Sequence, residues 1–156
     1  MGSARRVEPP PSQPRHYATF NLAWAALLAA VTTVTPSEGP PARELPLFGL
    51  ATFSLTKTLS KEKVGTWVRQ PLVDDEHRPR GRGLRYVAGE LVTCTRCLGT
   101  WSALGLVGLR AARPREARLV AGVLATSAIN DFLQCGFSWL TSCANRSATA
   151  PPHPSP

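Results

Sequence analysis

The chain is poor in acidic residues and lacks the patterns that would tie its positive charge to nucleic acid. Its 156 residues include 10 acidic and 18 basic side chains, which give a formal net charge of +8. Such a basic chain favours either nucleic acid or an anionic lipid surface as its neighbour. Aromatic residues do not alternate with the arginines, and no nucleic-acid-binding motif is present. The sequence therefore predicts anionic lipid headgroups, and no nucleic acid, as partners.

Patterns typical of nucleotide binding and of nucleophilic catalysis are also missing. The segment Gly81-Arg82-Gly83 is too short for a phosphate-binding loop and has no lysine. No Ser/His/Asp constellation has support in the sequence, so a non-enzymatic protein is favoured over an enzyme. The chain has only four cysteines, and their spacings do not resemble the disulfide framework of a small secreted domain.

Large apolar side chains are nearly absent from both ends of the chain. Residues 1–16 form a basic segment, and residues 144–156 form a proline-rich one. Neither can bury enough apolar surface to offset the entropy of ordering, so we expect both to be disordered tails. The residues between them, 17–143, are expected to form one membrane domain.

Four apolar segments predict an all-α membrane protein with about four membrane-embedded helices, of which the last two form a hairpin. Residues 17–35 carry no charge and have the length of a bilayer span. The alternative for this segment is a signal peptide, but its polar leader is long and no small-residue cleavage site follows. The other helices are expected near 46–60, 98–112 and 117–140.

Basic residues are concentrated between the second and third expected helices. We expect a cytoplasmic loop over 61–93 with a lipid-facing basic patch made of Lys61, Lys63, Arg69, Arg78, Arg80, Arg82 and Arg85. Because cytoplasmic loops are enriched in Lys and Arg, this loop and the amino terminus are predicted to be cytoplasmic. The hairpin turn conflicts with that orientation because it is also basic, with Arg110, Arg113, Arg115 and Arg118. Either the hairpin crosses against the rule, which we prefer, or it enters the membrane without crossing.

The most specific stretch of the chain is Gly89-Glu90-Leu91-Val92-Thr93-Cys94-Thr95-Arg96-Cys97-Leu98-Gly99-Thr100-Trp101. Together with the blocks at 50–56 and 63–71, it resembles the bacterial domain-of-unknown-function family 1360. Thr95 and Thr100 stand where that family often has proline. The resemblance implies a small multi-pass inner-membrane protein, of a family that includes a sporulation-associated member, and it implies no reaction. The motif positions it marks are Gly89, Glu90, Leu98, Gly99 and Trp101, together with the two cysteines.

Cys94 and Cys97 permit three interpretations. They can bind zinc, although a structural zinc site needs four ligands and the remaining candidates are Cys135 and Cys143. They can exchange disulfides, which requires a thiol of lowered pKa, as Arg96 and a helix amino terminus would favour. They can also be small side chains packed at the start of a helix, which is the preferred interpretation. No cofactor is predicted, except zinc under the first interpretation.

Asp131 is the other candidate site residue, because a carboxylate within an apolar helix is costly and often functional. Counted from the hairpin turn, it lies at a depth similar to that of Arg96, so an Arg96–Asp131 ion pair is a hypothesis. The alternative is that the helix ends near Asn130 and leaves Asp131 in water.

These observations predict a small integral protein of the bacterial inner membrane. Its expected role is that of a non-enzymatic structural or interaction component with an unidentified protein partner. The alternative is a membrane thiol protein that uses its Cys-x-x-Cys pair for metal binding or thiol–disulfide exchange.

Overall fold

The computed structural model describes residues 13–34 and 40–148, and these residues are helical with connecting turns. The helices are α1 Pro14–Val34, α2 Leu45–Ser60, α3 Thr66–Arg69, α4 Leu84–Thr93, α5 Thr95–Ala112 and α6 Pro114–Ala148. Two 3-10 turns, η1 Ala42–Glu44 and η2 Lys63–Gly65, precede α2 and α3. Within the described ranges, β pairing is limited to one isolated bridge between Val73 and Pro79. The all-α prediction is confirmed.

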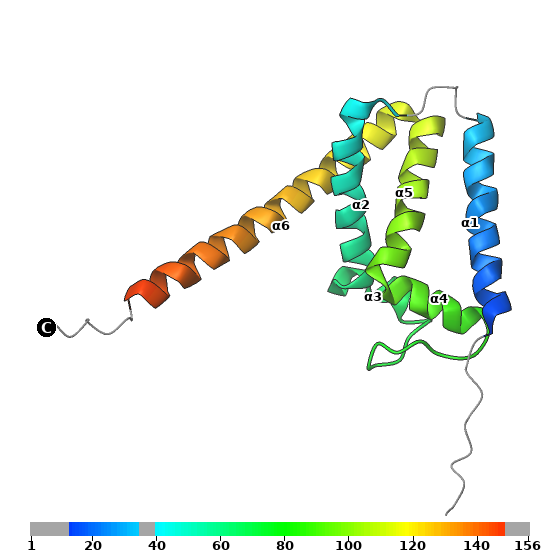
Figure 1. Cartoon of the computed structure of the whole chain (residues 1–156), viewed down its shortest axis with the longest axis horizontal. Coiled ribbons are helices and arrows are strands. Elements are labelled where there is room, and N and C mark those ends of the chain that lie inside the picture. The colour runs from blue at the N-terminus through cyan, green and yellow to red at the C-terminus, as the bar shows by residue number, and fades with distance from the viewer. Residues whose placement is uncertain (1–12, 35–39, 149–156) are drawn as a thin grey trace, which may run out of the picture.

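Three helices lie side by side in this fold, with α5 between α1 and α2 (Figure 1). The chain ascends in α1, descends in α2 and ascends again in α5, and α4 lies across the lower end of the group. The start of α1, the end of α2, the connecting segment and the start of α5 therefore share one end of the molecule. We call this the α4 end, and the opposite end, where η1 and the turn at Arg113 lie, the η1 end.

The core forms where α6 crosses α2. Its buried side chains come from α2, α5 and α6, and they are Phe48, Ala51, Leu106, Ala117 and Ala121. The alanine stripe of α6 continues at Ala125 and Ala128, and small residues at this spacing let two helices approach closely. Because this stripe faces α2, α6 diverges from α5 after the turn at Arg113 (Figure 1). The expectation that the last two helices form an antiparallel hairpin is therefore corrected. The chain turns at Arg113, and α6 then crosses α2.

Several expected boundaries are also corrected. The structure begins α1 at Pro14, where the Gln13 N–H donates to His16 Nδ1 at 3.0 Å, and it extends α6 to Ala148. Parts of the two tails expected at 1–16 and 144–156 are thus helical, and the rest of each tail lies outside the described residues. The expected loop over 61–93 contains η2, α3 and α4. Helix α4 buries Val87, Gly89 and Val92 against the rest of the chain.

The far half of α6 leaves the other helices. Phe132 still stacks on Phe53 of α2, with ring centroids 5.2 Å apart. Beyond it the helix exposes large apolar side chains, including Phe137, Trp139 and Leu140, and Figure 1 shows it extending away from the body. Among the described residues, one helix is long and apolar enough to cross a membrane, over Pro114–Arg146.

A carboxylate joins three helices at the η1 end. Glu44, at the end of η1, is 8 % exposed. One of its oxygens accepts from Arg110 Nε of α5 at 2.9 Å, and the other accepts from Arg118 Nε of α6 at 2.9 Å. The hydrogen bond from Arg110 and the charges of both guanidinium groups hold the pKa of Glu44 below its ordinary value, although burial acts in the opposite direction. This triad fixes the start of α2 to the end of α5 and the start of α6.

Replacing Glu44 with glutamine (E44Q) should lower the melting temperature of the detergent-purified protein by several degrees at pH 7, because two arginines lose their shared carboxylate. The lowered pKa means that this stabilisation is complete above the ordinary glutamate pKa and is lost as the pH falls through the lower folded-state value. The melting temperature of E44Q should therefore vary less with acid pH than that of the unchanged protein. The matched control is E116Q, since Glu116 is exposed and lies 3.8 Å from an exposed Arg113. Equal losses for the two variants would contradict the triad's role.

Candidate functional site

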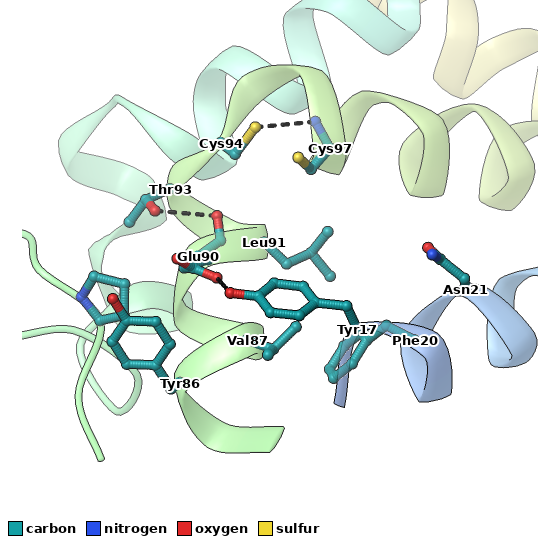
Figure 2. Close-up of a pocket in the computed structure, with 11 residues that line it drawn as sticks. Tyr17, Phe20, Asn21, Tyr86, Val87, Glu90, Leu91, Thr93, Cys94 and Cys97 are labelled. Carbon is teal, nitrogen blue, oxygen red and sulfur yellow. Dashed lines mark hydrogen bonds between the residues drawn. The ribbon is translucent and has the colours of Figure 1, made fainter. Parts of the chain in front are cut away.

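The two cysteines of the Cys-x-x-Cys pair lie where α4 ends and α5 begins. Cys94 has an extended backbone, with φ −91° and ψ 106°, and caps the amino terminus of α5. Its Sγ accepts a hydrogen bond from the Cys97 N–H at 3.3 Å (Figure 2). A side chain at this position satisfies one of the helix's otherwise unpaired N–H groups. The spacing of the pair is thus used to cap a helix.

The Cys94 thiol is placed to ionise more readily than an ordinary cysteine. Hydrogen bonds from the Cys97 thiol and from the Cys97 backbone N–H hold the pKa of Cys94 below its ordinary value, and the charge of Arg96 acts in the same direction. Cys94 is half-buried and Cys97 is exposed, and both thiols are free. A thiolate at a helix amino terminus is a nucleophile or a metal ligand.

A cavity of about 580 Å³ adjoins the two cysteines. It lies between α1, α4 and the start of α5, and Figure 2 shows Tyr17 reaching across it from α1. Its lining is mostly apolar, with Glu90 as the carboxylate, and it comprises Tyr17, Phe20, Asn21, Pro79, Tyr86, Val87, Glu90, Leu91, Thr93, Cys94 and Cys97.

The described residues do not assemble a metal site around the pair. No group of three His, Cys, Asp or Glu side chains in the described ranges could hold a metal ion. Cys135 and Cys143, the expected further ligands, lie on the far half of α6, away from the α4 end (Figure 1). The idea of one zinc site made from all four cysteines is therefore wrong, because α6 diverges instead of folding back along α5.

Gly89 and Glu90, two family-motif positions on α4, make specific contacts. A Cβ added at Gly89 would lie 2.8 Å from the Leu72 carbonyl oxygen and 2.9 Å from Pro79 Cβ, so glycine is needed where α4 meets the preceding segment. Glu90 accepts a hydrogen bond from the Tyr17 hydroxyl of α1 at 2.5 Å (Figure 2). The first half of the motif thus positions α4 against two neighbours.

The second half of the motif holds α1 against α5. Trp101 meets Phe20 of α1 edge to face, with centroids 6.2 Å apart, and Trp24 Nε1 donates to the Thr100 carbonyl oxygen at 3.3 Å. Leu98 and Gly99, the remaining motif positions, are half-buried, and Gly99 faces Thr56 of α2. The motif side chains therefore serve mainly to pack helices.

Asp131 pairs with a different cation from the one expected. Its Oδ2 lies 2.8 Å from Lys57 Nζ of α2, and Glu62 Oε1 lies 3.1 Å from the same nitrogen. Arg96 is exposed on α5 and makes no ion pair with Asp131. The Arg96–Asp131 hypothesis is wrong because α6 packs across α2, so that Asp131 pairs with Lys57 of α2.

The expected basic patch is only partly a free surface. Arg69 is 3 % exposed, and it donates to the carbonyl oxygens of Leu59 and Glu62 at 2.5 and 2.8 Å, so it braces the turn after α2 and does not face lipid. The other members are exposed, and several have polar partners on the chain itself: Arg78 with Asp74 and Glu76, Arg80 with Asp75, Arg85 with the Pro71 carbonyl oxygen, and Lys61 with the Thr93 carbonyl oxygen. Lys63 and Arg82 complete the exposed set.

Comparison with known proteins gives one assignment. A family model described as "Protein of unknown function (DUF1360)" matches residues 47–137, which is more than half of the chain. The chain belongs to the DUF1360 family. No curated protein and no solved structure matches it. The DUF1360 segment contains most of α2, all of α3 to α5 and most of α6, so α1 packs onto the family motif from outside the matched range.

Three residues of these contacts were not assigned to a site by sequence reasoning: Tyr17, Glu44 and Lys57. A usable signal existed for Lys57, because it and Asp131 are opposite charges within two apolar segments, where unpaired charges are costly. Tyr17 and Glu44 gave no such signal, because Tyr17 is uncharged and Glu44 lies in the polar, proline-rich segment between two apolar runs.

Alanine at position 89 (G89A) should destabilise the protein by about 1–3 kcal/mol, because its Cβ would clash with backbone atoms that cannot move away cheaply. The change can be measured by reversible unfolding in mixed detergent micelles. The matched control is G99A in the same motif, whose Cβ would lie 4.0 Å from Thr56 Oγ1. That variant should remain within about 1 kcal/mol of the unchanged protein. A neutral G89A would contradict the close approach described here.

Proposed function

We propose that this DUF1360 protein is a multi-pass protein of the bacterial inner membrane, with α1, α2, α5 and α6 embedded in the bilayer. The observation that carries the proposal is the outward surface of α6. Only 17 % of its most apolar stretch is buried within the chain, whereas the core helix of a water-soluble protein would be mostly covered. Lipid is the solvent that suits such a surface. Helix α1 supports the same view, because residues 17–34 contain no charged side chain.

The distribution of charge supports an orientation with the α4 end in the cytoplasm. The exposed lysines and arginines of the segment between α2 and α5 lie at this end, together with the start of α1. Cytoplasmic segments carry such an excess of basic residues. The arginines of the η1 end conflict less than their number suggests, because Glu44 pairs with Arg110 and Arg118. Arg113 and Arg115 remain as the cations of that turn.

Within the membrane, the proposed role is that of a structural or interaction component without catalysis of its own. The motif side chains support this role, because they hold α1, α4 and α5 together. The far half of α6 supports it as well, because its apolar side chains extend beyond the helices that could cover them. A transmembrane partner protein would bind there.

Membrane insertion can be tested with the full-length protein expressed in bacteria. It should remain in the membrane pellet after alkaline carbonate extraction. In a variant with all four cysteines replaced by serine, R113C should react with a membrane-impermeant maleimide in intact spheroplasts, whereas H77C should react only after permeabilisation. Release by carbonate would overturn the membrane proposal. Labelling of both positions from the same side would overturn the crossing of α5 but not its membrane association.

A second candidate function is thiol–disulfide exchange at Cys94 and Cys97. The specific observation that favours it is the capping contact, which places the Cys94 sulfur at the start of α5 beside an exposed second thiol. Exchange would begin with attack of the Cys94 thiolate on a disulfide of a partner, and Cys97 would then resolve the mixed disulfide.

Variants with only one of the two cysteines distinguish thiol–disulfide exchange from a packing role. The Cys97 backbone N–H and the charge of Arg96 lower the pKa of Cys94 and remain when the Cys97 thiol is replaced. The variant that retains only Cys94 should therefore reach half of its maximal iodoacetamide rate at a lower pH than the variant that retains only Cys97. Protection of both thiols in the folded protein would exclude exchange and leave helix packing as their role. Stoichiometric zinc in the unchanged protein, lost in C94S/C97S, would instead indicate that ligands come from a partner or a second copy.

A further inference from the structure

A second hollow, distinct from the cavity beside the cysteines, lies between α2 and the start of α5. Its volume is about 410 Å³. One wall is a face of α2 with Gly49, Phe53 and Thr56, and the other is the first turn of α5 with Arg96 and Gly99. We call it the α2–α5 groove. Its lining is mostly apolar, and Gly49 leaves open space, since a Cβ added there would meet nothing within 4 Å.

A buried hydroxyl in this groove has no partner. Thr56 is 5 % exposed, and its Oγ1 makes no hydrogen bond to any described residue. Its neighbours on α2 behave differently: Thr52 Oγ1 donates to the Phe48 carbonyl oxygen, and Ser60 Oγ donates to the Thr56 carbonyl oxygen. Leaving a buried hydroxyl unpaired is costly, so such a group usually marks a missing partner. A Cβ on Gly99 would lie 4.0 Å from this oxygen, which places the hydroxyl at the groove's wall facing α5.

Two cationic side chains, Lys57 and Arg96, line the α4 end of the groove, and one of them has no ion-pair partner among the described residues. Lys57 is already held between Asp131 and Glu62. Arg96 is exposed and forms no ion pair with any residue in the described ranges. It lies in the first turn of the 18-residue helix α5, where backbone N–H groups and the helix dipole also favour an anion. The groove therefore has a cationic end, a hydroxyl beside it and an apolar remainder.

We propose that the α2–α5 groove binds one anionic phospholipid. The phosphate would bind Arg96 at the first turn of α5, a glycerol or ester oxygen would pair with the Thr56 hydroxyl, and an acyl chain would lie along Phe53 and Gly49. Basic pockets between membrane helices at the cytoplasmic side suit such headgroups. The apolar lining favours a lipid over a free phosphate, which would leave most of the groove empty. This inference depends on the proposed membrane location, in which the groove opens to the bilayer at headgroup depth.

Native mass spectrometry of the full-length protein in a zwitterionic detergent tests the proposal. The unchanged protein should retain one phosphatidylglycerol more readily than one phosphatidylcholine. The variant R96Q should weaken phosphatidylglycerol binding by about fivefold, the loss expected for one cation at a headgroup. The control R115Q removes the same charge from the η1 end and should leave binding unchanged. Equal binding by R96Q and R115Q would overturn the site.

Two further variants separate binding from folding. T56V removes the unpaired hydroxyl without changing side-chain size, so it should weaken phosphatidylglycerol binding without lowering the melting temperature. G49L, on α2, should fill the apolar part of the groove and displace the lipid, whereas its control G105L adds the same side chain at an open position of α5 that does not line the groove. Unchanged binding by both T56V and G49L would overturn the proposal.

The source of the phosphate is tested in the same assay. Glycerol 1-phosphate, which has the headgroup chemistry without acyl chains, should not compete with the lipid at millimolar concentration. Full competition would indicate a soluble phosphate ligand and overturn the lipid assignment. If the protein resists carbonate extraction but shows no lipid preference, this inference fails alone. Release by carbonate instead overturns the membrane location on which it rests.

Discussion

The arrangement of the long helices depends on the carboxylate of Glu44. The start of α2 meets the distant turn between α5 and α6 at this side chain, and two guanidinium groups neutralise it while it is shielded from water. Because Arg110 and Arg118 lie on opposite sides of the turn at Arg113, the shared carboxylate fixes how α5 leads into α6. The alanine stripe of α6 then packs across α2, and the far half of α6 extends away from the other helices.

The opposite end of the molecule is organised by the motif at 89–101. Gly89 permits close packing, Glu90 and Trp101 contact α1, and Cys94 caps α5. Glu90 and Cys94 also line the cavity beside the thiols, so packing and any thiol chemistry share these two side chains. This overlap explains why the motif suggested several functions: helix caps, metal sites and redox pairs all use two cysteines at this spacing.

Sequence reasoning predicted those features that depend on local composition. The charge-free stretch at 17–35 and the apolar run at 46–60 lie where the structure has α1 and α2, because apolar length and the breaking effect of proline act over short distances. The family resemblance was also evident from the motif itself and is confirmed. By contrast, the Arg96–Asp131 hypothesis assumed that α6 folds back along α5. A count of helical rise gives depth but not the direction in which a helix packs, and the alanine stripe that sets this direction was not recognised.

The basic segment between α2 and α5 is a second case in which the sequence did not predict what a side chain contacts. Arg69 looked like its neighbours in sequence, yet its guanidinium group is used to bind two backbone carbonyl oxygens at the turn after α2. An arginine can bind lipid or satisfy unpaired carbonyl groups, and the choice is made by the turn around it. Composition alone could not separate these roles.

The contact between Tyr17 and Glu90 has a consequence for how the chain is made. Tyr17 leaves the ribosome 73 residues ahead of its partner. At a synthesis rate of about 5–20 residues per second, α1 waits roughly 4–15 s before α4 and α5 exist to receive it. During that interval the apolar side chains of residues 17–34 are without the contacts that α4 and α5 give them in the folded chain. Assembly of the finished protein is then a late docking step, in which the first helix to be synthesised joins a bundle whose other members are made after it.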